Sequence, residues 1–181
     1  MNSKVPDLTS YNFSGQVVAN FVTTGQGVFK DNNGSSRGVS NEIDREVLIH
    51  LRSRANAVLI GGDTARVENY KKDTRFETFV LTNRDLQIND GLTRFMAGSD
   101  SELEDAIASL RAENQGLLVE TGPTLVAKLA ELGLIDIVCL TIVDPVEEPQ
   151  AILKSLFNID RAELLSSQEL GNTLLTVWKL K

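Results

Sequence analysis

The sequence has few of the residues from which disulfides and metal centres are built. It contains one cysteine, Cys139, and one histidine, His50, in 181 residues. One cysteine excludes a disulfide within the chain, and no group of His, Cys and Asp residues has the spacing of a metal site. A Ser-His-Asp triad would have to use His50, which has no catalytic motif around it. The sequence therefore favours neither a metalloenzyme nor a hydrolase of this type.

The chain also lacks a basic excess and long apolar runs. Its net charge is −7, which argues against general nucleic-acid binding because that function needs a basic face. No apolar run approaches the ~20 residues that span a bilayer, and residues 1–15 lack the pattern of a signal peptide. Cys139 lies in an apolar run and is predicted to be a core residue. We expect one cytoplasmic domain over residues 1–181, with 1–15 as a lead-in arm, that binds neither nucleic acid nor a membrane.

Apolar runs and helical patterns alternate along the chain, which predicts an α/β fold. The order indicates a mostly parallel sheet whose C-terminal edge is an antiparallel pair. Helices are expected to begin near residues 40, 101, 123 and 149, and residues 101–104 have the pattern of a capping box. The expected strands are 16–24, 57–60, 78–82, 93–96, 116–120 and 135–143, followed by the pair 161–168 and 173–181.

The first helix is predicted to begin with Ser40 or Asn41 as its cap. Asp44 lies in its first turn, where the helix dipole favours an acid. Arg45 and Arg52 are seven residues apart and share a face. Arginines in such positions usually face solvent, so this is the expectation for both.

Two glycine-bearing turns each lead from an apolar strand to a helix. Gly61-Gly62 follows the first strand, and Asp63 and Thr64 stand where a helix cap is expected. Residues 121–125, Thr-Gly-Pro-Thr-Leu, follow the second strand and place proline at the first helical position. Ligands of open α/β sheets bind beyond the carboxyl ends of strands. If the two strands are neighbours, the turns could hold one dinucleotide with its pyrophosphate on a helix N-terminus, whereas each turn alone could equally bind nothing.

Four segments together resemble a known family, although neither a G-x-G-x-x-G fingerprint nor a P-loop is present. They resemble the reductase domain of the bifunctional riboflavin-biosynthesis deaminase–reductase, in the dihydrofolate-reductase-like superfamily. The resemblance implies helices on both faces of the sheet, NADPH as cofactor and a homodimer. The segments are 20–27, then Gly38-Val39-Ser40 with Asp44-Arg45 and Leu51-Arg52, then 57–70, then 119–125 with 133–136.

The resemblance also implies which residues contact ligands. The segment 81–84 is similar to the part of the superfamily that reads the 2′-phosphate, which favours NADP over NAD. Arginines suit the phosphate of a phosphorylated pyrimidine-type substrate because they pair with it bidentately. The expected cofactor contacts, including the glycines of the first turn, are Val22, Gly38, Gly61, Gly62, Thr64, Glu68, Thr82, Arg84, Gly122, Pro123, Thr124 and Leu125. The expected substrate contacts are Asn20, Ser36, Arg52, Arg75 and Glu120.

The implied reaction is reduction of 5-amino-6-(5-phosphoribosylamino)uracil by NADPH, with hydride transfer to the ribose C1′. The sequence identifies no acid or base for it. The family usually has Leu-Asp-Gly after the first strand, whereas this chain has Gly25-Gln26-Gly27, and an amide cannot serve as a general acid. The alternatives are a related NADPH reductase of another small substrate and a dinucleotide-binding protein without catalysis.

Overall fold

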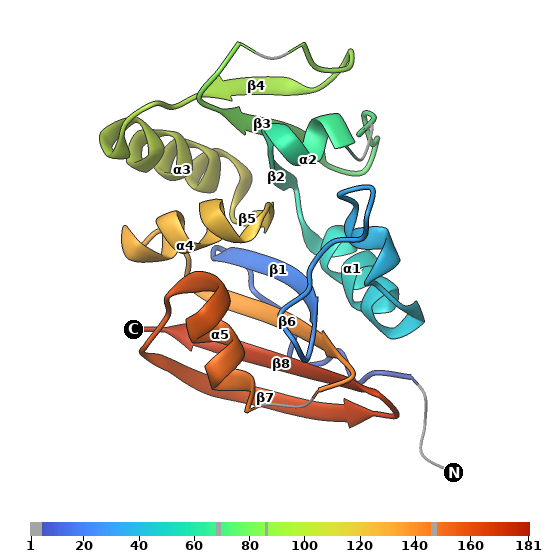
Figure 1. Ribbon diagram of the computed structural model, residues 1–181. Coiled ribbons are helices and arrows are strands. Elements are labelled where there is room, and N and C mark those ends of the chain that lie inside the picture. Colours follow the sequence, from blue (N-terminus) through green and yellow to red (C-terminus); the bar gives the residue numbers. More distant parts are fainter. Residues whose placement is uncertain (1–4, 68–69, 86, 146–147) are drawn as a thin grey trace.

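A single twisted sheet forms the centre of the molecule. The computed structural model describes residues 5–67, 70–85, 87–145 and 148–181. Within these ranges, eight strands lie in the order β4-β3-β2-β5-β1-β6-β8-β7, from top to bottom in Figure 1. The strands are β1 (Val17–Thr24), β2 (Ala57–Gly61), β3 (Glu77–Thr82), β4 (Thr93–Met96), β5 (Leu117–Glu120), β6 (Ile137–Val143), β7 (Ala162–Leu170) and β8 (Thr173–Leu180).

The strand directions confirm the predicted sheet. Strands β1 to β6 run parallel to one another, so their carboxyl ends meet at one edge. Strand β8 runs antiparallel to β6, and β7 runs antiparallel to β8. The two apolar strands with glycine turns, β2 and β5, are hydrogen-bonded neighbours, with Ile60 in register with Glu120. The two turns therefore lie side by side.

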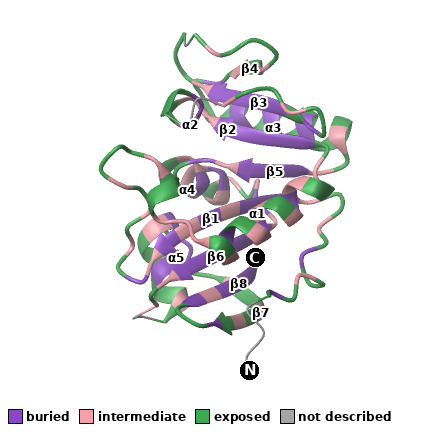
Figure 2. Cartoon of the chain, turned by 90° about the vertical axis from the view of Figure 1, so that its right-hand side faces the viewer, coloured by how far each residue is buried: buried purple, intermediate pink, exposed green. Residues whose placement is uncertain are grey.

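Helices cover both faces of the sheet, as predicted. Successive strand residues point to opposite faces, so Ala19 packs with α3–α5 whereas Val18 packs with α1 and α2. The apolar positions of β2, residues 57–60, are fully buried between these layers, and Figure 2 shows β2, β3 and β5 coloured largely as buried. The helices are α1 (Glu42–Arg54), α2 (Gly62–Val67), α3 (Asp100–Asn114), α4 (Pro123–Glu131) and α5 (Pro149–Phe157), with a 3-10 turn η1 (Ser36–Gly38) before α1.

Two details of the apolar interior follow from the sequence. Cys139 is 1% exposed in the cluster beside α1, which confirms it as a core residue. Tyr11, in the lead-in arm, is 3% exposed and packs into the same cluster, so the arm covers part of the sheet. No helix among the described residues is long and apolar enough to cross a membrane.

Two predicted helix starts are wrong. Helix α3 begins two residues earlier than residues 101–104 suggest, with Ser99 and Glu102 as its capping box. Ser99 caps the helix in place of Ser101, because the Glu102 carboxylate accepts the backbone N–H groups of both Gly98 and Ser99. Helix α2 starts at Gly62, directly after β2, so Asp63 lies in its first turn and is not its cap.

Of the two predicted caps of helix α1, Ser40 and Asn41, the structure has the second. Asn41 is its cap, and its side chain accepts the backbone N–H of Asp44. The Asn41 amide also donates to the Thr173 hydroxyl at 2.7 Å, which fixes the start of α1 against β8. The acid at position 44 is thereby held over the sheet.

The burial of β2 makes its side chains the most sensitive to truncation. Leu59→Ala removes a fully buried side chain from the middle of the sheet. We expect the free energy of unfolding to fall by about 2–5 kcal/mol, through lost transfer free energy and the cavity left behind. Ile49→Ala on α1, where the side chain is 54% exposed, is the control and should change it by less than about 0.5 kcal/mol. Urea denaturation measures both, and equal effects would contradict the assigned core.

Candidate functional site

A cleft of about 1660 Å³ follows the carboxyl edge of the parallel strands. It is lined from the ends of β1, β2, β3 and β5, from α1 on one side and from the start of α4 on the other. Both glycine turns lie in its wall. A Cβ atom on Gly61 would stand 3.8 Å from the Thr121 side chain, which shows how closely the turns approach each other.

The start of α4 is open to the cleft. Gly122 is the N-cap of α4, and no side chain caps the helix. A Cβ atom on Gly122 would meet no atom of the described residues within 4 Å, and the backbone has ordinary extended angles. Neither packing nor backbone strain therefore requires glycine here, whereas close approach of a ligand would. An uncapped helix N-terminus offers unpaired N–H groups to an anion, so these residues fit a dinucleotide pyrophosphate.

Arg52, Glu120 and Tyr70 form a polar cluster between α1 and the end of β5. Arg52 Nε donates to Glu120 Oε1 at 2.8 Å, and Arg52 Nη2 donates to Oε2 at 2.5 Å. The Tyr70 hydroxyl donates to Oε2 at 2.6 Å and also contacts Arg52. Burial alone would lower the pKa of Arg52, but the hydrogen bond and charge of Glu120 raise it above its ordinary value. The expectation that Arg52 faces solvent is wrong, because Glu120 faces α1 and needs a cation.

Deeper on the α1 side, the cleft contains unsatisfied polar atoms. Asn20 Oδ1 and Asp44 Oδ1 are buried and have no hydrogen-bond partner among the residues that the structure describes. Asp44 is 3% exposed, and its Oδ2 accepts the Ser40 hydroxyl at 2.6 Å. Burial, with the charge of Glu120 adding to it, raises the pKa of Asp44 above its ordinary value. Native proteins rarely leave buried polar atoms unpaired, so these two oxygens are candidates to accept hydrogen bonds from a ligand.

The structure brings most of the predicted contact residues together. The predicted substrate residues that line the cleft are Asn20, Ser36, Arg52 and Glu120, and Arg84, which follows the end of β3, lines it as well. Glu68 lies outside the described residues. The predicted cofactor residues that line the cleft are Val22, Gly61, Gly62, Thr64, Thr82, Arg84, Gly122, Pro123, Thr124 and Leu125.

Two predicted residues do not line the cleft. Arg75 is held by Asp73 through Nε at 3.0 Å and Nη2 at 2.7 Å, and it stacks on Phe76. These hydrogen bonds lower the pKa of Asp73 to about 2. Gly38 lies against Asp31, where a Cβ atom would stand 2.5 Å from the aspartate Cβ. Its glycine is thus explained by packing within the loop.

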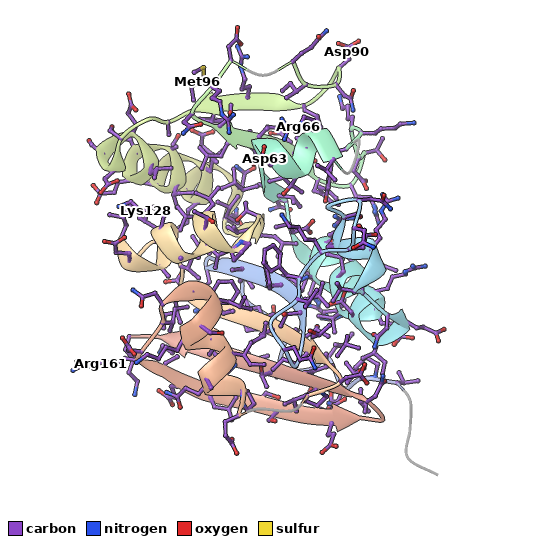
Figure 3. The ribbon with its side chains drawn as sticks, viewed as in Figure 1. Asp63, Arg66, Asp90, Met96, Lys128 and Arg161 are labelled. Atoms are coloured by element: carbon purple, nitrogen blue, oxygen red, sulfur yellow. The ribbon has the colours of Figure 1, made fainter. Side chains whose placement is uncertain are left out.

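Sequence reasoning gave no role to three residues of the cleft. The sequence pattern indicates a helix-dipole role for Asp44 and no ligand contact. Asp44 and Tyr70 both lie in segments that carry the family resemblance, and this position in the sequence is the signal that points to the site. Lys128 lines the cleft one turn beyond Thr124 on α4, and its ammonium pairs with Asp100 at 2.8 Å. Figure 3 shows Lys128 on α4 and, on α2, the pair Asp63 and Arg66.

No metal site accompanies these groups. Among the residues that the structure describes, no three His, Cys, Asp or Glu side chains gather in a way that could hold a metal ion. The site offers hydrogen bonds, two kinds of charge and a helix N-terminus, which suit binding and alignment of organic ligands.

Solved structures of other proteins share the fold. A pyrimidine reductase-like protein from Corynebacterium diphtheriae is 21% identical, with a TM-score of 0.69, and 97% of this chain covers 95% of that one. Dihydrofolate reductase from Enterococcus faecalis, complexed with NADP(H) and RAB-propyl, is 15% identical, with a TM-score of 0.66 and coverage of 93% and 98%. These likenesses confirm the dihydrofolate-reductase-like fold.

A third structure is a longer protein. It is the diaminohydroxyphosphoribosylaminopyrimidine deaminase/5-amino-6-(5-phosphoribosylamino)uracil reductase of Thermotoga maritima, which is 14% identical with a TM-score of 0.67. The alignment covers 93% of this chain and 57% of that one. None of the curated proteins matches the sequence. Residues 16–146, which span both glycine turns and the cleft, match the family described as the RibD C-terminal domain. The chain therefore belongs to the RibD C-terminal domain family.

Proposed function

We propose that the protein is an NADPH-dependent reductase that converts 5-amino-6-(5-phosphoribosylamino)uracil to its ribityl form. The observation that carries the proposal is the pairing of β2 with β5, which sets two glycine turns side by side at the cleft. Membership of the RibD C-terminal domain family supports the reaction, and the dihydrofolate reductase neighbour is a complex with NADP(H). The Thermotoga maritima neighbour is described as a reductase of this pyrimidine.

The cofactor would lie along the carboxyl edge of the strands. Its pyrophosphate would rest on Gly122 and the first turn of α4, with Thr64 of the neighbouring turn beside it. Arg84 lies at the end of the cleft where a 2′-phosphate would meet it. NADPH supplies a hydride when bound. The chain's own work is alignment, because holding donor and acceptor carbons together removes much of the entropic barrier.

The substrate would occupy the α1 side of the cleft. Asn20 and Glu120 would orient the pyrimidine, because both line the cleft, Asn20 from the middle of β1 and Glu120 from the end of β5. Arg52 holds Glu120 through Nε and Nη2, which leaves Nη1 for a phosphate oxygen. Ser36 lies in the same wall and can add a hydroxyl donor. Arg75 would have to leave Asp73 to take part.

The proposal includes a homodimer and a cytoplasmic setting. Strand β7 is the edge of the sheet, and its Leu164 and Leu165 are 46% and 47% exposed. Exposed leucines on an edge strand favour pairing with a second copy. Cys139 is buried as a free thiol, which fits a reducing compartment.

A dinucleotide-binding protein without catalysis is the second candidate. Gln26 favours it, because an amide replaces the family carboxylate. Gln26 is exposed and does not line the cleft, however, so the substitution leaves the cleft itself unchanged. The two candidates differ in whether bound NADPH is oxidised.

Anaerobic mixing with NADPH and the ribosylaminopyrimidine phosphate tests the reaction. We expect loss of nicotinamide absorbance that matches the ribityl product in amount, because one hydride is transferred for each product molecule. NADPH binding without oxidation on this pyrimidine would contradict the proposed reaction and favour the second candidate.

Thr64→Arg tests the position of the cofactor. A long cationic side chain in the cleft wall would fill space assigned to NADPH, so we expect binding at least about tenfold weaker by calorimetry, or ~1.4 kcal/mol. Ala108→Arg on the exposed face of α3 is the control and should bind NADPH as the native protein does. Equal binding by both variants would place the cofactor elsewhere.

Arg52→Ala tests the phosphate contact. We expect the KM for the phosphorylated substrate to rise more than about tenfold, because charge-assisted hydrogen bonds are lost and Glu120 loses its cation. The KM for the same substrate without its phosphate should rise less. Arg54→Ala, an exposed arginine at the end of the same helix, is the control. An equal rise for both substrates would show that Arg52 does not contact the phosphate.

A further inference from the structure

Asp44 differs from every other described carboxylate in the wall of the cleft. The others each have a Lys or Arg nitrogen close by, and Asp44 has none within 4 Å in the described part of the chain. The pairs are Asp63 with Arg66, Asp73 with Arg75, Asp85 with Arg94, Asp100 with Lys128 and Glu120 with Arg52.

The surroundings of Asp44 disfavour its charged form. It is 3% exposed, and within the described ranges its Oδ1 has no hydrogen-bond partner. Glu120 faces it from β5, Tyr11 from the lead-in arm and Thr141 from β6, and none of these is a cation. The positive charge that acts on it, Arg45, is exposed on its own helix. Burial raises the pKa of such a carboxyl, because an isolated ion loses its hydration.

Asp44 is connected to the cleft by a hydroxyl. Ser40 Oγ lies 2.6 Å from Asp44 Oδ2, and both residues line the cleft. Ser40 is only half-buried. A buried acid, a short hydrogen bond and a hydroxyl at the cleft wall form a path along which a proton can pass.

We propose that Asp44 is the acid of this site and that Ser40 relays its proton to the substrate. The inference rests on the proposed reduction. In that reaction a C1′–H bond forms with the hydride and the C1′–O4′ bond breaks. The ring oxygen O4′ takes the Ser40 proton and becomes a hydroxyl, and Ser40 recovers a proton from Asp44. The substrate gains two electrons from NADPH, whose oxidised form is NADP⁺, and solvent returns one proton to Asp44.

This assignment accounts for the altered loop after β1. Gln26 cannot donate a proton, and it lies outside the cleft. The acid of the reaction is then provided from α1, by a carboxyl that the Asn41 cap holds over the sheet. Retaining a buried acid without a cation destabilises the fold, which is expected of a residue kept for chemistry.

The test is single-turnover reduction between pH 5 and 9 by the native protein, Asp44→Asn and Ser40→Ala. We expect both variants to transfer hydride about 100-fold more slowly or worse, with KM unchanged. The native rate should fall as pH rises through the folded pKa of Asp44, because the protonated form is active, and Asp44→Asn should lose this dependence. Asp105→Asn on the exposed face of α3 is the control.

A second measurement needs no ligand. Asp44 keeps its proton in the fold at pH values where the unfolded chain has lost it, so native stability relative to Asp44→Asn should fall as pH rises from about 4. Urea denaturation of both proteins across this range measures the difference. A difference that does not change with pH shows that Asp44 is not a buried acid and overturns the proposal.

The outcomes separate the two proposals. If the native protein reduces the pyrimidine and Asp44→Asn does so at the native rate, the acid is elsewhere and the reduction stands. If the native protein oxidises no NADPH at any pH, the reduction fails, and the role of Asp44 fails with it. If Asp44→Asn does not fold, the Ser40→Ala variant tests the proposal. Full activity of this variant, which lacks the Ser40 hydroxyl, would contradict the relay.

Discussion

The parallel pairing of β2 with β5 is the constraint on which the rest of the site depends. Ile60 lies opposite Glu120, so the residues after each strand emerge together at one edge of the sheet. A Cβ atom on Gly61 would thereby stand 3.8 Å from the Thr121 side chain, and Gly122 is the N-cap of α4 next to it. The apolar strands β2 and β5 are packed between two helical layers, which holds this edge of the sheet in place. A ligand at this edge meets a preformed surface.

All the described carboxylates in the cleft wall except Asp44 form ion pairs. Arg52 and Glu120 satisfy each other between α1 and β5, with Tyr70 completing the cluster. Removing either ionic partner would leave a half-buried charge, which is more destabilising than the pair is stabilising. A ligand must therefore use the remaining donors of this cluster or rearrange it. Asp44 stands apart, because it is buried and, among the described residues, forms no ion pair, while its Oδ2 accepts the Ser40 hydroxyl.

The sequence predicts the sheet well and the polar contacts less well. A continuous apolar run such as 57–60 identifies a strand covered on both faces, because each side chain contributes to burial independently of its partners. The contact between Arg52 and Glu120 joins residues 68 positions apart, so it depends on how α1 crosses the sheet. The need for glycine at Gly38 comes from Asp31, which a helical or strand pattern does not reveal. Local patterns also overlap, as the start of α3 shows.

The most direct measurement of the central claim follows the hydride itself. NADPH deuterated at the reactive face of C4 of the nicotinamide is mixed with the ribosylaminopyrimidine phosphate, and the product is analysed by NMR and mass spectrometry. If the cleft aligns the nicotinamide with the ribose as proposed, the product carries one deuterium at C1′, on one face only. A ribityl product without deuterium at C1′, or with deuterium on both faces, would contradict this alignment.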